Sequence, residues 1–165
     1  MVTVAQVGDF DAIGALNAEA FREFAAHMSP EDWRSMEARI RAIESRAQLA
    51  RFLMVKDHET IVGSVGYCPA GKSDLAIFPT EWAAVLLLAV APAHRGRGIA
   101  RTLVSACIQC ARDDAAQAIG LFTSEVMTAA QQLYESMGFR RDGELPPKYG
   151  LRYRRYKLPL NDFPD

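Results

Sequence analysis

The sequence has few cysteines, almost no net charge and no long hydrophobic run. Its net charge is −1, which gives no general attraction to nucleic acid or to an anionic membrane surface. No apolar run reaches the roughly 18–20 residues that a membrane-spanning helix requires. The N-terminal residues MVTVAQVGDFD lack the pattern of a signal peptide. We therefore expect a cytoplasmic location, with neither nucleic acid nor membrane as a partner.

The three cysteines do not form a metal-binding pattern. Cys107 and Cys110 make a C-x-x-C, but no second pair and no nearby histidine completes a zinc set. Both lie in a helical pattern, on or beside its apolar stripe, where a cysteine acts as a small buried side chain. No metal site is expected.

Length and composition are those of one globular domain, residues 1–165. Hydrophobic residues make up 50% of the chain and charged residues 24%, which is ordinary for a soluble fold. Internal repeats, low-complexity tracts and linkers are absent from the sequence. The chain is long enough to bury a sizeable core.

The most informative stretch is Trp82 to Arg101. An uncharged apolar run, Ala83 to Val90, is stopped by Pro92, and a short basic loop with two glycines follows. The next apolar residues recur at helical spacing: Ile99, Leu103, Val104, Cys107, Ile108 and Ala111. This pattern predicts a buried strand, a tight turn and a long helix that opens between Gly96 and Gly98.

That arrangement favours binding of a diphosphate. The first N–H groups of a helix have no partner inside it, and the helix dipole leaves partial positive charge there. Gly96 and Gly98 would let an anion approach the backbone, while Arg95, Arg97 and Arg101 add formal charge. The alternative interpretation of this short segment is a basic turn that is only exposed to solvent and binds no ligand.

The other segments complete a mixed α/β sheet. Strands are predicted at 2–7, 52–56, 61–67, 118–123, 139–142 and 152–158, the last two around a Pro146-Pro147 loop. Helices are predicted from Asp9 or Asp11 to about Phe24, from Ser29 to about Leu49, and from Thr128 to Met137. The resulting order is β-α-α-β-β-β-α-β-α-β-β, in which a parallel pair needs the helical crossover between its strands.

A nucleotide-binding P-loop is also suggested by letter pattern alone. Gly66-x-x-x-x-Gly71-Lys72-Ser73 satisfies the motif, which must open a helix that holds the phosphates. Only Asp74 and four apolar residues separate Ser73 from Pro79, which is too little chain for that helix. We interpret the match as accidental.

Two motifs carry a resemblance to a known family. Arg95-x-x-Gly98-x-Ala100, preceded by Leu88-Ala-Val-x-Pro92, resembles the signature of the GCN5-related N-acetyltransferases, the GNAT family. Downstream, the segment from Ala130 to Phe139 resembles the helix of that family with its LY-x-x-x-GF ending. The predicted element order is also that of the GNAT fold.

The resemblance implies acetyl-CoA as cosubstrate, without a metal. It places the pantetheine on the backbone of Leu88, Ala89 and Val90, as an added strand. It places the pyrophosphate on the turn made of Arg95, Gly96, Arg97, Gly98, Ile99 and Ala100, with Arg101 adding charge. Tyr134 takes the position that protonates the departing thiolate, and an N–H near Val90 would polarise the thioester carbonyl.

Two positions depart from what the resemblance implies. Ala84 stands where some relatives carry a glutamate base, and Met127 stands where many carry an asparagine that contacts the cofactor. Glu81 would point to the opposite face of the strand from position 84. Glu125, just past the next central strand, is the remaining candidate for a base acting through water.

The expected function is direct transfer of the acetyl group from acetyl-CoA to a primary amine. A small-molecule amine, a peptide N-terminus and a lysine side chain all remain open as acceptors, as does transfer of another acyl group. The alternative is a non-catalytic acyl-CoA-binding or sensor domain of the same fold. A homodimer is compatible with the sequence.

Overall fold

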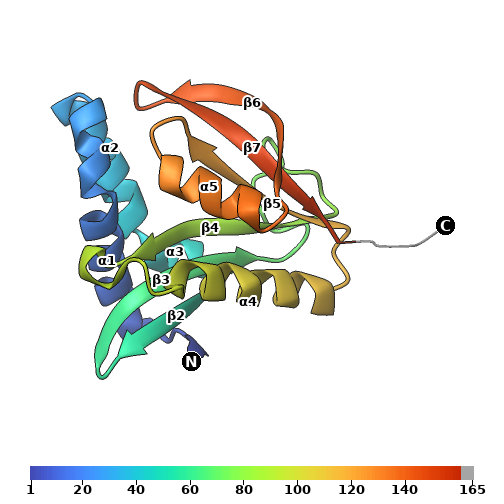
Figure 1. The fold of residues 1–165 in the computed structure, drawn as a ribbon, viewed down its shortest axis with the longest axis horizontal. Coiled ribbons are helices and arrows are strands. Elements are labelled where there is room, and N and C mark those ends of the chain that lie inside the picture. Colours follow the sequence, from blue (N-terminus) through green and yellow to red (C-terminus); the bar gives the residue numbers. More distant parts are fainter. Residues whose placement is uncertain (161–165) are drawn as a thin grey trace.

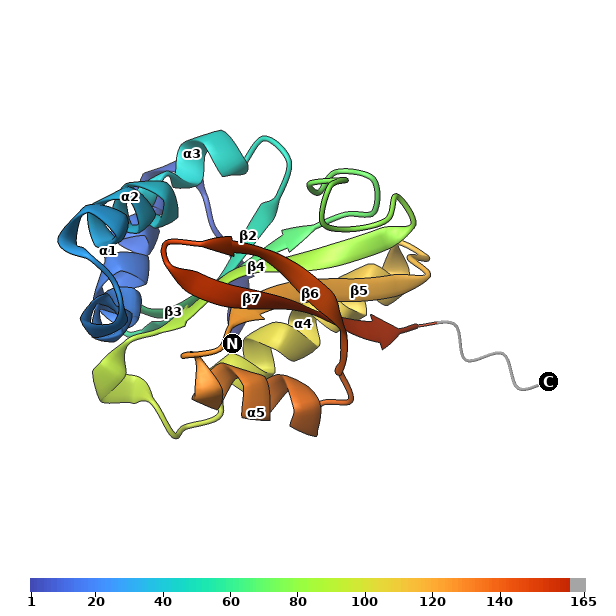
Figure 2. The same cartoon turned by 90° about the horizontal axis from the view of Figure 1, so that it is seen from above.

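The computed structural model describes residues 1–160 as a seven-stranded mixed sheet with helices on both faces (Figure 1). The helices α1 to α3 lie on one side of the sheet, and α4 and α5 lie on the other (Figure 2). In chain order the strands and α-helices are β1 (Val2–Val4), α1 (Phe10–Phe21), α2 (Pro30–Arg41), α3 (Ile43–Arg46), β2 (Arg51–Asp57), β3 (Thr60–Cys68), β4 (Trp82–Val90), α4 (Ile99–Asp113), β5 (Ala118–Ser124), α5 (Thr128–Ser136), β6 (Arg140–Lys148) and β7 (Leu151–Pro159). Among the helices of residues 1–160, none combines the length and the hydropathy of a membrane-spanning segment.

The sheet opens into a fork at its centre. Its order is β1-β2-β3-β4-β5-β7-β6, and β4 runs parallel to β5. These two strands pair only from Trp82↔Ala118 to Ala84↔Gly120. Beyond that point β5 stays paired with β7 as far as Ser124, while β4 stays paired with β3 as far as Val90. The second half of β4 therefore has one backbone edge that β5 does not cover.

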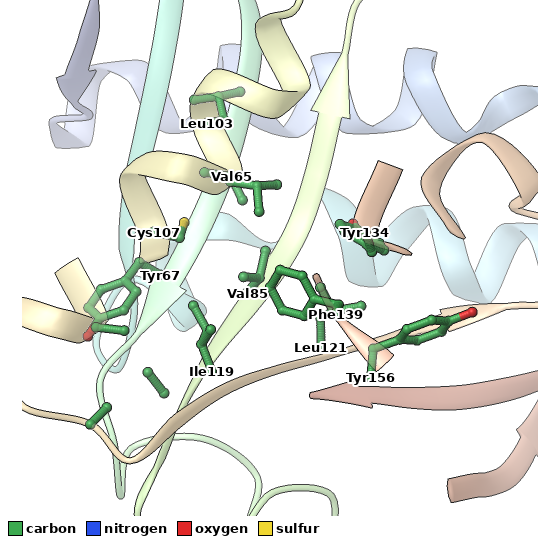
Figure 3. Close-up of a cluster of buried hydrophobic side chains, with 14 of the residues drawn as sticks. Val65, Tyr67, Val85, Leu103, Cys107, Ile119, Leu121, Tyr134, Phe139 and Tyr156 are labelled. Carbon is green, nitrogen blue, oxygen red and sulfur yellow. The ribbon is translucent and has the colours of Figure 1, made fainter. Parts of the chain in front are cut away.

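Alternation along β4 divides the core between the two faces. Ala83 and Val85 pack with α4, whereas Trp82 and Ala84 pack on the side of α1 and α3. Figure 3 shows Leu103 and Cys107 of α4 pointing at the sheet near Val65, as the predicted apolar stripe requires. Because both faces are covered, β4 consists of an unbroken apolar run and does not alternate with polar residues.

The predicted mixed α/β fold is confirmed, with local corrections. The first strand ends at Val4, and the first helix continues beyond Phe21 as a 3-10 turn, η2 (Arg22–His27). The second helix does not reach Leu49, because Ala42 leaves the helical region at φ −80° and ψ 69°. The short helix α3 starts immediately after this break and runs in its own direction (Figure 1).

The prediction of a loop at Pro146-Pro147 is wrong. Both prolines lie within β6, which is an edge strand, and a register irregularity falls between Leu145 and Lys148. Proline is tolerated at such places because no ladder hydrogen bond from its nitrogen is needed. The reversal occurs instead at Tyr149 and Gly150, with φ values of 55° and 71°. Two consecutive positive φ angles are typical of a tight two-residue hairpin.

Candidate active site

A cavity of about 690 Å³ occupies the fork between β4 and β5. Its floor is the second half of β4, and its other walls come from both faces of the sheet. On one side they are the β4–α4 turn and α5; on the other they are α1, α2, α3 and the hairpin of β6 and β7. Nine of the ten predicted cofactor residues and the predicted acid, Tyr134, line it; the nine are Leu88, Ala89, Val90, Arg95, Gly96, Gly98, Ile99, Ala100 and Arg101.

The floor of the cavity contains a β-bulge. Gly66 pairs with Leu86 and Ser64 pairs with Ala89, so β4 has one more residue than β3 between these pairs. Leu87 lies in this bulge with φ 51°, a conformation that leucine rarely adopts. The bulge lies just past Ala84, the last residue of β4 that pairs with β5, and a bulge bends its strand locally.

The N-terminus of α4 opens onto the same cavity. Gly98 is the N-cap residue at φ 77°, and the first helical hydrogen bond runs from the N–H of Thr102 to the carbonyl of Gly98, at 3.0 Å. Among residues 1–160, no backbone acceptor is bound by the N–H groups of Ile99, Ala100 or Arg101, which precede that bond. A Cβ added at Gly98 would meet no atom within 4 Å. The helix end therefore offers free donors facing open space.

The three arginines of the turn have different surroundings. Arg95 pairs with Glu23 at 3.1 Å and donates to the carbonyl of Ala20, also at 3.1 Å. Arg101 donates to the hydroxyl of Ser136 at 2.7 Å. Arg97 is exposed, does not line the cavity, and has no salt bridge with the described residues. Arg95 and Arg101 thus tie the turn to α1 and α5.

Tyr134 lies on α5 with its ring buried in the core and its side chain lining the cavity. Its ring centroid is 5.8 Å from that of Phe139 and 6.4 Å from that of Tyr156 (Figure 3). Burial raises the pKa of Tyr134 well above its ordinary value, with a smaller contribution from Cys107. The phenol therefore remains protonated throughout the neutral and mildly alkaline range.

The remaining sequence candidates lie elsewhere or are apolar. Glu125 is exposed outside the cavity, and its carboxylate accepts from the N–H of Arg152 at 3.4 Å. Ala84 is fully buried under the fork, while Met127 lines the cavity. The segment after Ser73 contains no helix before β4 begins, so within residues 66–82 the P-loop pattern lacks a phosphate-binding helix end.

Sequence reasoning did not place α2 and α3 in the wall opposite α5. That wall includes Met36, Arg39 and Ile40 of α2, Arg46 of α3 and Tyr149 of the hairpin. The spacing of Met36 and Ile40 marks the buried face of α2. No local signal shows that this face lines a cavity, because the facing hairpin is more than a hundred residues away in the chain.

Residues 12–139 match the acetyltransferase (GNAT) family. The match covers most of the chain, so the chain belongs to this family and the resemblance seen in the sequence is confirmed. Among curated proteins, human N-acetyltransferase 8B is 34% identical over 93 residues, 56% of this chain and 40% of that protein. Rat N-acetyltransferase 8B is 36% identical over 101 residues, which are 58% of this chain and 42% of that protein. The chain therefore spans about two-fifths of the length of these relatives.

Solved structures share the fold over nearly the whole chain. The ribosomal-protein-alanine N-acetyltransferase of Brucella melitensis has a TM-score of 0.73 at 24% identity, covering 97% of this chain and 99% of its own. The yncA protein of Salmonella typhimurium was solved with its cofactor acetyl-CoA. It has a TM-score of 0.73 at 22% identity, and the match covers 99% of this chain and 95% of the yncA chain. PaiA N-acetyltransferase of Thermoplasma acidophilum was solved with coenzyme A. It has a TM-score of 0.71 at 14% identity, and the match covers 96% of this chain and 99% of the PaiA chain.

Proposed function

We propose that this chain is an acetyl-CoA-dependent N-acetyltransferase that transfers the acetyl group directly to a primary amine. The observation that carries the proposal is the cavity in the fork, which joins an unpaired strand edge to a free helix N-terminus. Family membership and the acetyl-CoA and coenzyme A complexes of structural neighbours support it.

The chain has suitable groups for two parts of coenzyme A, the pantetheine arm and the pyrophosphate. The open backbone edge at Leu88, Ala89 and Val90 can pair with the two amides of a pantetheine arm. The free N–H groups at the start of α4 can bind the pyrophosphate, and Gly96 and Gly98 leave room for its approach. Hydrogen bonds to charged groups contribute about 1.5–3 kcal/mol each, so a few of them can hold the ligand.

When bound, acetyl-CoA supplies an acetyl group activated as a thioester. An unprotonated acceptor amine attacks the carbonyl carbon, and an N–H near Val90 stabilises the negative charge that grows on the carbonyl oxygen. As the C–S bond breaks, Tyr134 donates its phenolic proton to the sulfur. The amine nitrogen loses its extra proton to solvent or to a water-linked group, and the phenolate of Tyr134 regains a proton from solvent. Because the amine attacks the thioester directly, no covalent enzyme intermediate is formed.

Activity is expected to rise with pH between about pH 7 and pH 9, because an alkylamine has a pKa of about 10.4 and must lose a proton before it attacks. The raised pKa of Tyr134 keeps the acid protonated over this range, so no falling limb is expected there. The measurement is kcat/KM for an accepted amine against pH, for the parent, Glu81→Gln and Glu125→Gln. All three profiles should coincide, because neither carboxylate lines the cavity.

An acid limb at about pH 6–7 that disappears in one variant would identify a carboxylate base and refute this account of proton removal.

The same assay separates the proposal from a non-catalytic acyl-CoA sensor, the alternative that Ala84 and Met127 keep open. A sensor would bind acetyl-CoA and release no coenzyme A beyond the uncatalysed rate with any amine.

A further inference from the structure

The side of the cavity opposite α5 is basic where the acceptor would enter. The two carboxylates that line the cavity already have partners: Glu23 pairs with Arg95, and Asp74 accepts from the N–H of Ala76 at 2.9 Å. Arg39 of α2 and Arg46 of α3 line the same cavity. Neither arginine forms a salt bridge with a carboxylate of residues 1–160.

The two guanidinium groups are close enough to influence one another. Burial lowers the pKa of Arg46, and the nearby charge of Arg39 lowers it further. Arg46 donates to the carbonyl of Arg39 over 3.5 Å, a long bond that uses one of its five N–H donors. Arg46 is half-buried, whereas Arg39 is exposed beside it. A half-buried cation without a carboxylate partner is usually matched by an anion, since removing it from water without one is costly.

The hairpin of β6 and β7 completes this corner of the cavity. Its turn places Tyr149 at positive φ, and Tyr149 and Tyr153 both line the cavity. Burial raises the pKa of Tyr153 to about 12, so its hydroxyl remains a neutral hydrogen-bond donor. Lys148 lines the same corner, with its ammonium 5.3 Å from the centre of the Tyr149 ring.

An apolar stretch separates this basic corner from the strand that would hold the acetyl group. Met36 and Ile40 pack with Met127 in a buried cluster, and Leu87 and Tyr149 pack against that cluster. Leu87 is the bulge residue of β4. The same cluster therefore touches the floor of the fork at one end and the hairpin turn at the other.

We propose that Arg39 and Arg46, with Tyr149 and Tyr153, bind a carboxylate of the acceptor, and that the acceptor is an amino-acid-like amine with an apolar body. The inference rests on the proposed function, because it assigns the acceptor end of the same cavity. The amine is directed to the fork, the apolar body contacts Met36, Ile40 and Met127, and the carboxylate meets the two guanidinium groups. A polycationic amine is disfavoured, because it would meet like charge at Arg39 and Arg46.

The test uses product-like probes, so it does not depend on finding the natural acceptor. N-acetyl derivatives of alanine, leucine and phenylalanine, and the matching carboxamides that lack the negative charge, are titrated by calorimetry into protein saturated with coenzyme A. The parent should bind at least one carboxylate about tenfold or more tightly than its carboxamide. Arg39→Gln and Arg46→Gln should each lose this preference. Arg34→Gln, which changes an exposed arginine of the same helix α2 that does not line the cavity, should retain it.

Equal affinity for every carboxylate and its carboxamide, or no binding of any pair, would overturn the assignment. So would a preference that survives in both Arg39→Gln and Arg46→Gln. Titration of coenzyme A alone into the same proteins separates the two proposals. If coenzyme A binds and the carboxylate preference is missing, only the acceptor assignment fails, whereas absence of coenzyme A binding is a failure of the proposed function.

Discussion

Replacing Gly98 with aspartate is expected to weaken coenzyme A binding by about 100-fold or more, equivalent to about 2.8 kcal/mol. Gly98 has φ 77° and faces open space at the start of α4, so the new carboxylate would occupy the approach of the pyrophosphate. Its negative charge would also cancel the partial positive charge of the helix end. Isothermal titration with coenzyme A measures the effect, and circular dichroism checks that the variant is folded.

Two variants control for causes other than lost anion binding. Gly143→Asp introduces the same side chain at another positive φ, 114°, in open space on β6 and away from the cavity. Lys72→Ala removes the lysine of the P-loop-like segment. Both should bind coenzyme A as the parent does. A loss in Lys72→Ala equal to that in Gly98→Asp would show that the anion site is wrongly placed.

Tyr134→Phe should lower kcat by about 100-fold while changing the affinity for coenzyme A by no more than a few-fold. The phenyl ring preserves the packing with Phe139 and Tyr156, so the variant loses the donated proton and little else. Single-turnover measurements of acetyl transfer, made alongside coenzyme A titration, give the two quantities separately.

Tyr156→Phe is the matched control for this variant. Tyr156 is fully buried in the same cluster but does not line the cavity, and its hydroxyl contacts Arg141 and Glu135 instead. Its loss should affect stability more than kcat. An unchanged single-turnover rate in Tyr134→Phe would remove Tyr134 from the chemistry and leave it a role in packing.

The part of the site built from one continuous segment could be predicted from the sequence. The run from Trp82 to Arg101 contains the strand, the turn and the helix start in order, and each has a local cause. Apolar residues form β4, Pro92 ends it, and Gly98 adopts the positive φ of the N-cap position. The helix stripe follows from residue spacing alone.

The part built across the fold could not be predicted. Leu87 adopts positive φ because β3 and β4 differ by one residue in register, and no local preference of leucine indicates this. Nor does sequence show that Arg95 is engaged by Glu23, a residue of η2 that is distant along the chain. The wall opposite α5 depends on the helix break at Ala42 and on the hairpin turn at Tyr149. The sequence patterns predict instead a helix that continues to about Leu49 and a loop at Pro146-Pro147.

The claim that the fork binds acetyl-CoA is tested most directly by thermal unfolding with acetyl-CoA, coenzyme A or Mg-ATP. A ligand at 100 times its Kd stabilises the folded state by about 2.7 kcal/mol, which raises the Tm of a domain this size by about 5–10 °C. We expect acetyl-CoA and coenzyme A each to give such a shift and Mg-ATP to give a much smaller one. Protection by Mg-ATP without protection by either coenzyme A species would contradict the account.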